Sequence, residues 1–570
     1  MEERTLLAII LSLLIIIGYQ YFFVPKPSIE PPKKINGVLQ PDSNNIHPKK
    51  DLSESQDITK ENEFIESFQH IDTFQKKRQV ELIDIKTDRY RVSLTNKNAW
   101  LRGFELIKYQ AMPHFITSPL KASFWSQVLN EYKKFFRNKS KNFSHYPNVN
   151  LISPAHDEEF YNLKLVDSEL DNFGTGTYDM KVINDHKVRF EFIDNQGFQI
   201  IKLVEFNDDD YRIKLTIEIK NLTQHVKKKD YYLVWEKIID ESMEKGHRNF
   251  IGAGWFLNNK KKQFKISKIK NSIKNNLDIG WISLENNYFT TCIIPIEKDH
   301  ESIIFKETLS DKLKKLSIGI KYPAKELLPG SSVSDEYIIY MGPKLNEELI
   351  KVQDNLKYVI NYGFFSFLAR PTIFLLKLIY KYLPNYGWAI IILTIITKII
   401  FYPLTEKSFQ SMKKMQVIQP KINEIKQKYK NDMVQTNQEV MALYKEYGVN
   451  PMGGCLPMLI QIPVFFALYE ALLVAIEIRG APFMLWITDL SAMDPLLITP
   501  IIMGITMFFQ QKTMSTSIDP RQAKLFTLMP VMFTFFFLGF PSGLVIYWMI
   551  NNILTIGHQY IVNTISNKSA

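Results

Sequence analysis

Cysteine is nearly absent from this chain of 570 residues, which contains only Cys292 and Cys455. We expect these two to lie in different compartments, so they cannot pair, and the sequence excludes a disulfide framework. It also lacks a His-Glu-x-x-His motif, a Gly-x-Ser-x-Gly motif and a glycine-rich phosphate loop. Without such a constellation we expect no catalytic residue, no metal and no cofactor.

The formal net charge of +11 would ordinarily suggest a nucleic-acid partner. Here the cations are mostly lysine, alternate with acids, and accompany many asparagines and isoleucines. Codon bias alone can produce such a composition. We therefore expect no specific nucleic-acid partner.

Five apolar stretches near the C-terminus approach the length of a membrane-spanning helix. A bilayer core of about 30 Å needs about 20 helical residues, so the shorter stretches fit only where the membrane is thin or protein covers their ends. The stretches are residues 385–405, 455–476, 495–511, 525–540 and 542–562. One basic residue, Lys398, lies inside the first, at a depth where a charge is costly and usually functional. We expect a polytopic α-helical core over residues 385–563.

The N-terminus carries one further apolar run, from Leu6 to Val24. Its aromatic end and its lack of a small-residue cleavage site favour an uncleaved anchor over a signal peptide. Residues 1–24 therefore add a sixth transmembrane helix. Residues 25–75 are rich in proline, lysine, asparagine and serine without apolar periodicity, which predicts a flexible periplasmic linker.

Several runs between residues 76 and 345 alternate apolar and polar residues, as in 187–193 and 211–219. This period places one set of side chains on a single sheet face, and turn residues separate the runs. We expect an all-β domain there, an antiparallel β-sandwich. Residues 363–383 are apolar but are interrupted by cations and a proline, which predicts a periplasmic interfacial helix within residues 346–384.

Charge placement orients these segments. Residues 406–451 contain eight lysines and five acids, whereas residues 477–495 contain one arginine and three acids. By the positive-inside rule, the first of these loops is cytoplasmic. Both termini, including the short tail 564–570, are then cytoplasmic, and the β-domain is periplasmic.

The cytoplasmic loop 406–451 has a periodicity of its own. Apolar residues recur every three or four positions in two arms, which predicts a helical hairpin whose apolar stripe lies against the membrane face. Pro420 should kink the first arm. The stripe comprises Phe409, Met412, Met415, Ile418, Ile422, Ile425 and Tyr429 in the first arm, and Val440, Met441, Tyr444 and Tyr447 in the second.

The residues alone leave two interpretations of Lys398 open. Its side chain could snorkel to the cytoplasmic interface, or its charge could serve a pathway. Polar residues in the same segments either hold helices together or line a wet groove. These polar residues are Thr394, Thr397, Gln461, Thr506, Gln510, Gln511, Asn551 and Asn552.

Motifs over residues 360–563 closely resemble the YidC family of membrane-protein insertases. They include Asn385-Tyr-Gly-Trp, Phe401-Tyr-Pro-Leu-Thr, Asn450-Pro-Met-Gly-Gly-Cys, Asp489-Leu-Ser-Ala-Met-Asp-Pro and Phe540-Pro-Ser-Gly-Leu-Val. Gly280-Trp-Ile-Ser and Tyr340-Met-Gly-Pro-Lys are similar to the periplasmic domain of Gram-negative members. The resemblance implies a periplasmic β-supersandwich and a hydrophilic groove with one central cation.

The resemblance also implies roles for particular residues. Lys398 occupies the position of the central cation, and the other matching groove positions are Thr394, Gln461, Gln511 and Trp548. Asn98-Ala-Trp-Leu departs from the family pattern, because it stands where the domain usually begins with paired glycines. The tail 564–570 is short, which leaves a ribosome contact in question.

We therefore predict an insertase and chaperone of the bacterial inner membrane that works alone or with the Sec translocon. Its expected partners are nascent inner-membrane proteins, membrane lipids, the Sec translocon and, less directly, the ribosome. A secondary transporter would need duplicated halves, and we find no such repeat. A membrane-anchored enzyme acting on carbohydrate and an assembly scaffold without insertion activity remain open alternatives.

Overall fold

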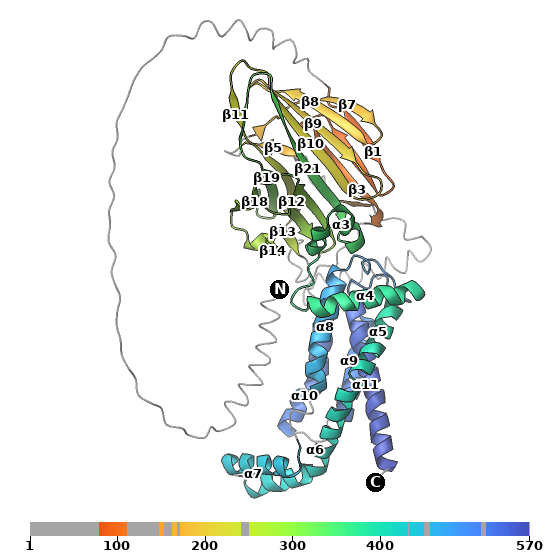
Figure 1. Cartoon of the computed structure of the whole chain (residues 1–570). Coiled ribbons are helices and arrows are strands. Elements are labelled where there is room, and N and C mark those ends of the chain that lie inside the picture. The colour runs from red at the N-terminus through yellow and green to blue at the C-terminus, as the bar shows by residue number, and fades with distance from the viewer. Residues whose placement is uncertain are drawn as a thin grey trace, which may run out of the picture. The chain divides into compact units, whose positions relative to one another are not determined.

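The computed structural model describes an antiparallel β-domain followed by a helical region (Figure 1). The anchor and the linker predicted for residues 1–24 and 25–75 lie outside the described residues. The described residues are 79–110, 148–152, 162–167, 172–240, 250–430, 432–449, 456–514 and 520–568.

Two large antiparallel sheets dominate the β-domain. The nine-stranded sheet has the order β14-β13-β16-β17-β21-β10-β9-β8-β7, and the six-stranded sheet has the order β15-β18-β19-β12-β5-β6. A four-stranded sheet, β1-β2-β3-β4, and the pair β11-β20 also belong to it. The strands are β1 (Leu82–Lys86), β2 (Tyr90–Thr95), β3 (Trp100–Gln110), β4 (Asn148–Asn150), β5 (Lys164–Val166), β6 (Asn172–Phe173), β7 (Asp179–Asn184), β8 (Lys187–Ile193), β9 (Phe198–Phe206), β10 (Arg212–Asn221), β11 (Lys227–Lys229), β12 (Tyr232–Asp240), β13 (Ile251–Leu257), β14 (Lys260–Lys265), β15 (Ser272–Asn275), β16 (Trp281–Asn286), β17 (Phe289–Pro295), β18 (Glu301–Thr308), β19 (Leu313–Lys321), β20 (Lys325–Leu327) and β21 (Ser332–Pro343).

Alternating side chains build the core of this domain. Strand β10 buries Ile213, Leu215 and Ile217 on one face, and it pairs with β9 on one side and β21 on the other. Leu233 and Ile318 of the six-stranded sheet belong to the same hydrophobic cluster. Because the two sheets share one core, the β-rich domain predicted from period-two alternation is confirmed.

A buried lysine supports the turn at Asn98 and Ala99. Both residues have positive φ, 59° and 53°, in the left-handed region that favours glycine. Lys202 Nζ donates to the carbonyls of Asn98 (3.1 Å) and Leu163 (3.0 Å). Burial lowers the pKa of Lys202 to about 7, from an ordinary value of 10.5.

This lysine makes the stability of the β-domain depend on pH. Between about pH 7 and pH 10.5 the unfolded chain binds a proton that the folded chain does not, so the free energy of unfolding rises with pH in that window. From pH 7 to pH 9 we expect Lys202 to raise the free energy of unfolding by about 2 kcal/mol. The variant Lys202→Met should lack this rise. Urea unfolding of the Cys455→Ser protein, with labelling of buried Cys292 as the readout, measures how the free energy of unfolding changes with pH. It is carried out with and without Lys202→Met. Equal slopes with and without Lys202 would contradict this assignment.

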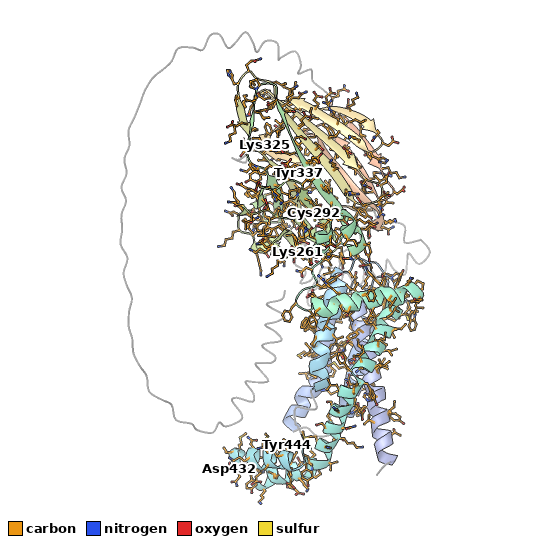
Figure 2. All side chains as sticks on the ribbon, viewed as in Figure 1. Lys261, Cys292, Lys325, Tyr337, Asp432 and Tyr444 are labelled. Atoms are coloured by element: carbon orange, nitrogen blue, oxygen red, sulfur yellow. The ribbon has the colours of Figure 1, made fainter. Side chains whose placement is uncertain are left out.

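A second buried cluster of charges lies in the nine-stranded sheet. Glu285 of β16 forms ion pairs with Lys261 of β14, at 2.7 Å, and with Lys344, and all three side chains are buried. Burial lowers the pKa of Lys261 to about 8, although the carboxylate opposes this shift. Figure 2 labels Lys261 and nearby Cys292 within the β-domain. Two buried cations therefore depend on one carboxylate.

The helical region begins with three short elements. The segment 346–384, expected as one interfacial helix, contains α3, η3 and α4, and Gly363 with a φ of 65° separates η3 from α4. The helices are α3 (Asn346–Val352), η3 (Asp354–Val359), α4 (Ser366–Tyr382), α5 (Tyr386–Ile400), α6 (Tyr402–Lys428), α7 (Met433–Glu446), α8 (Leu456–Val474), α9 (Ile498–Met514), α10 (Pro520–Phe537) and α11 (Ser542–Lys568).

Helix α4 has two apolar faces. Ile373 and Leu376 are buried in the core of the helical region, and α4 packs against α5 and α8. Phe367 and Phe374 are about two-thirds exposed on the other side. An apolar face without a protein partner among the described residues is what a helix at a lipid interface requires.

Helices α5, α8, α9, α10 and α11 overlap the five predicted apolar stretches. By length and hydropathy, one helix among the described residues is able to cross a membrane, namely Tyr386–Lys428, which joins α5 and α6. Gln461–Val474 and Leu528–Phe537 are apolar but shorter. The count of six spans therefore stays a prediction.

Candidate functional site

Three of the sequence motifs meet where α5 and α11 begin. Asn385 caps α5 by accepting a hydrogen bond from the Gly387 N–H (2.9 Å), and its Nδ2 donates to the Phe483 carbonyl (3.0 Å). The Ser542 hydroxyl, at the start of α11, donates to the Asp489 carbonyl (2.9 Å). These motif residues hold helix ends together.

Asp494 holds the start of α9 in place. Its buried carboxylate accepts from the N–H and the hydroxyl of Thr499, both at 2.7 Å, and from the N–H of Leu496 at 2.9 Å. Trp486 Nε1 donates to the same carboxylate at 3.2 Å. A buried carboxylate with this many donors is a structural acceptor, so the chemistry must be sought further along the helices.

One face of α11 carries a polar row, which we define as Asn551, Asn552, Thr555, His558 and Gln559. All of these side chains except the half-buried His558 are buried. Sequence reasoning named only the two asparagines. The spacing of three and four residues from 551 to 559 would have identified the others, because it places them on one helix face.

The polar row joins α11 to two neighbouring helices. Lys398 Nζ of α5 donates to Thr555 Oγ1 at 2.7 Å. Gln559 exchanges two hydrogen bonds with Thr513 of α9, at 2.7 and 2.8 Å. Asn551 Oδ1 is buried and accepts no hydrogen bond in the part of the chain that the structure describes. The row therefore contains both satisfied links and an acceptor that water or a substrate could use.

Lys398 is a cation without an acid partner among the described residues. The same lysine lies on α5, whose composition is otherwise apolar apart from its threonines. The side chain reaches across to α11, since its bond joins residues 157 positions apart. A charge in this setting normally faces protein or water and marks a functional path.

The other predicted groove residues have different surroundings. The hydroxyl of Thr394 donates to the Ile390 carbonyl of its own helix (2.7 Å), and Gln461 Nε2 donates to the Tyr547 hydroxyl. Trp548 packs against aromatic rings of α8 and α10, and Gln511 of α9 is half-buried. In the part of the chain that the structure describes, no hydrogen bond connects any two of the residues Lys398, Thr394, Gln461 and Trp548.

The predicted hairpin buries its stripe within itself. Ile418 and Ile422 of α6 form a cluster with Leu443 of α7 and with Val449, and partly buried members surround it. These are Met415, Ile425, Val440 and Tyr444. Met412 is half-buried outside this cluster, and α6 continues through Pro420. The stripe therefore has a partner in the facing arm, which the expectation of burial against the membrane did not include.

Charging the hairpin core should unfold it. Ile418→Asp with Ile422→Asp buries two unpaired carboxylates, and we expect amide exchange in α6 and α7 to quicken by about a hundredfold or more, with loss of insertion. Val417→Asp with Met441→Asp, on exposed positions, is the matched control and should leave exchange unchanged. Lost insertion in the control, with normal exchange, would show instead that the outer face of the hairpin binds a partner.

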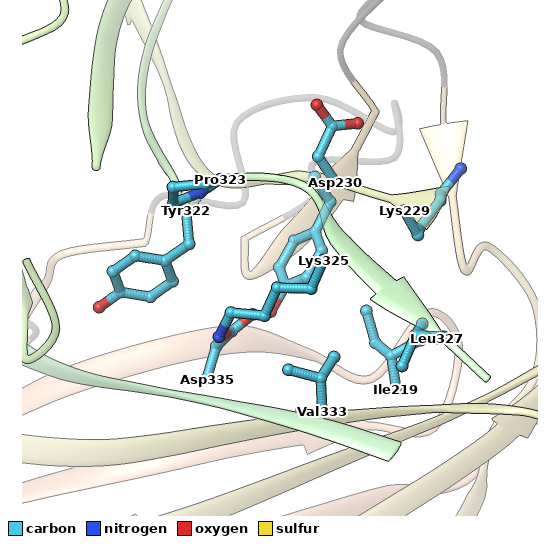
Figure 3. Close-up of a pocket in the computed structure, with 10 residues that line it drawn as sticks. Ile219, Lys229, Asp230, Tyr322, Pro323, Lys325, Leu327, Val333 and Asp335 are labelled. Atoms are coloured by element: carbon cyan, nitrogen blue, oxygen red, sulfur yellow. The ribbon is translucent and has the colours of Figure 1, made fainter. Parts of the chain in front are cut away.

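The β-domain contains a pocket that bears on the carbohydrate-enzyme alternative. Figure 3 shows Lys325 beside Asp335, and Lys325 Nζ lies 5.8 Å from the centre of the Tyr322 ring. Lys325 Nζ lies 2.9 Å from Asp335 Oδ1, and the Tyr231 hydroxyl donates to Oδ2 at 2.7 Å. Both carboxylate oxygens are engaged, so Asp335 is poorly placed as an acid or base for a substrate.

The fold and the polar row together define a membrane-associated protein. It has a large β-domain and a helical region with an internal cation. Comparison with known proteins is more specific. Residues 378–569 match the family model of the 60Kd inner membrane protein, and residues 122–375 match that of the YidC periplasmic domain.

Curated relatives agree over nearly the whole chain. The membrane protein insertase YidC of Syntrophus aciditrophicus is 36% identical over 572 residues and covers 99% of each chain. That of Citrifermentans bemidjiense is 43% identical over 395 residues, covering 69% of this chain and 73% of the relative. The chain belongs to the YidC family of inner-membrane protein insertases and includes the YidC periplasmic domain.

Solved structures are more distant. A crystal structure of an active YidC insertase is 20% identical, with a TM-score of 0.36, and the match covers 85% of this chain and 93% of that one. A putative aldose 1-epimerase of Escherichia coli K12 is 9% identical, with a TM-score of 0.27, over 46% and 99% of the two chains. Both TM-scores are low.

Proposed function

We propose that the polar row and Lys398 form the wall of a hydrophilic groove, through which this insertase passes the polar tails of nascent inner-membrane proteins. The observation that carries the proposal is Lys398, a cation on an apolar helix that is held by Thr555 and lacks an acid partner among the described residues. Thr394, Gln461, Gln511 and Trp548 are proposed to line the same groove.

The groove would lower the barrier to transfer in two ways. A polar tail crosses hydrocarbon slowly because its charges and peptide groups lose water, and a wet groove shortens that apolar path. Lys398 would attract an acidic tail before the apolar segment of the substrate partitions into lipid. The membrane potential adds about 2.3 kcal/mol per charge per 100 mV where it favours transfer. No covalent reaction or cofactor is required.

Finer features of the assembly belong to the same proposal. We propose six transmembrane helices with both termini cytoplasmic, an interfacial α4, and a cytoplasmic hairpin of α6 and α7. Work alongside the Sec translocon and contact with lipids fit this arrangement. A ribosome contact through the tail has weaker support, since Lys568 is the single basic residue of 564–570.

Rescue of depleted cells tests the function. The host's own insertase is depleted, this chain is expressed in its place, and protease mapping scores the insertion of proteins with one or two spans. We expect insertion to return. A chain that reaches the membrane intact and restores assembly of larger proteins, yet inserts none of these substrates, would favour a scaffold.

Thiol labelling in intact cells tests the orientation. In a Cys455→Ser background, Lys181→Cys on exposed strand β7 should react with an impermeant maleimide before lysis, and Lys414→Cys on exposed α6 only after lysis. Native Cys292 is buried and supplies the unreactive baseline. Labelling at position 414 before lysis would reverse the proposed topology.

A further inference from the structure

A hydrogen-bonded pair of a glutamate and a histidine joins the first helix of the hairpin to the polar row. His558 Nε2 of α11 lies 3.0 Å from Glu406 Oε2 of α6, and Glu406 Oε1 accepts from Gln410 Nε2 at 3.0 Å. The His558 and Glu406 side chains are 14% and 24% exposed. A pair that is partly shielded from water interacts more strongly than one on an open surface.

Two aromatic rings of α6 hold the imidazole in place. Tyr402 stacks on His558 with ring centres 4.8 Å apart, and Phe409 meets it edge-on at 4.9 Å. Tyr402, Glu406 and Phe409 follow at intervals of four and three residues, so they lie on one helix face. The first turns of α6 thus present one acid between two rings to the histidine of the polar row.

The location of the pair connects two parts of the proposed mechanism. On α11, Thr555 lies one turn before His558 and holds Lys398, while Gln559 follows directly and binds Thr513. On α6, Glu406 lies in the second turn after the helix starts, ahead of the cluster that joins the two arms of the hairpin. The direction in which the hairpin leaves the bundle is therefore set close to this pair.

We propose that Glu406 and His558 are positioning residues for insertion. Their pair holds the first turns of α6 against α11, and so keeps the hairpin in register with the end of the polar row that lies beyond Lys398. This inference rests on the proposed groove. It is separate from the role of Lys398, because neither residue needs to touch the substrate.

Distances between spin labels test the pair without reference to activity. Labels are placed on the full-length Cys455→Ser protein at exposed positions of α7 and α11, by Met441→Cys and Tyr560→Cys. We expect one narrow distribution of distances between the two labels. Glu406→Gln should broaden this distribution. The exchange of the two residues, Glu406→His with His558→Glu, should narrow it again. Glu424→Gln, an exposed acid on the same helix, is the matched control and should change nothing.

Insertion yield in depleted cells provides the second readout. Glu406→Gln should lower the yield by about fivefold, as expected for loss of a partly buried pair, and the exchange should restore it. If the exchanged protein does not accumulate, His558→Gln is the second variant, and it should broaden the distribution as Glu406→Gln does.

The outcomes separate this inference from the groove. A distribution that stays narrow in Glu406→Gln or in His558→Gln, or one that the accumulated exchange protein does not narrow again, overturns the positioning role. If the distances respond as expected while no variant of this chain, including the unmodified one, inserts any substrate, the groove is wrong and the pair stands as a structural contact.

Discussion

Insertion of proteins with acidic N-terminal tails is expected to fall by about a hundredfold when Lys398 is replaced by glutamate. The substitution places a carboxylate beside Thr555, where the tail's own acids would pass. Two like charges about 4 Å apart, at an effective dielectric constant of about 20, repel by about 4 kcal/mol. A hundredfold loss corresponds to about 2.7 kcal/mol, so the expected effect is within the available repulsion.

The other substitutions at position 398 distinguish a role of the charge of Lys398 from a role of water in the groove. Lys398→Arg should retain insertion, and Lys398→Gln should retain it only for tails without acids. Lys398→Leu should be neutral or stabilising if the lysine merely snorkels, because the cost of an intramembrane charge disappears.

The measurement compares insertion yields of paired substrates that differ only in tail charge. Lys512→Glu, an exposed lysine on α9, is the matched control for added negative charge. Yields that are independent of both the tail and the residue at position 398 would remove Lys398 from the mechanism.

The second large effect concerns folding of the β-domain. Replacing Glu285 by glutamine is expected to lower its free energy of unfolding by about 3–5 kcal/mol, because two buried cations lose their shared counter-charge. Although burial acts to raise the pKa of Glu285, Lys261 and Lys344 lower it below its usual range, so the carboxylate is ionised at neutral pH. Lys261 also donates to the Val359 carbonyl and cannot simply turn toward water.

Exposure of Cys292 reports this unfolding. The thiol is fully buried in β17, so its labelling rate in increasing urea follows opening of the β-domain in the Cys455→Ser protein. Glu336→Gln breaks an exposed pair with Lys214 and should cost at most about 1 kcal/mol. Equal urea midpoints for Glu285→Gln and Glu336→Gln would show that the buried lysines lose their charge at little cost.

Local periodicity was sufficient for most elements. The alternation around Ile213 predicted β10, long apolar stretches predicted the positions of α5 and α8 to α11, and a period of three to four predicted α6 and α7. Both patterns repeat within a few residues, so the backbone geometry of one segment dictates them. Lys398 was also evident from the chain, since a lone charge in an apolar stretch needs no partner to be noticed.

Contacts between segments that are far apart in the sequence could not be predicted from local periodicity. The hairpin stripe predicts burial against the membrane, because its spacing contains no indication that Ile418 packs on Leu443. Lys202 shares the phase of the buried residues Ile200 and Val204 in β9, but the strand pattern gives no sign of the two carbonyls that its amine reaches.

The sequence by itself determined the class of protein, the order of its β-domain and helices, and the position of the lone cation on an apolar helix. The tertiary structure decided that Lys398 meets Thr555, that Glu406 meets His558, and that the motif residues at the helix ends form a clamp. The reason is physical. A helix or strand pattern follows from spacing along the chain, whereas a hydrogen bond between residues 152 or 157 positions apart depends on how the packed helices bring their faces together.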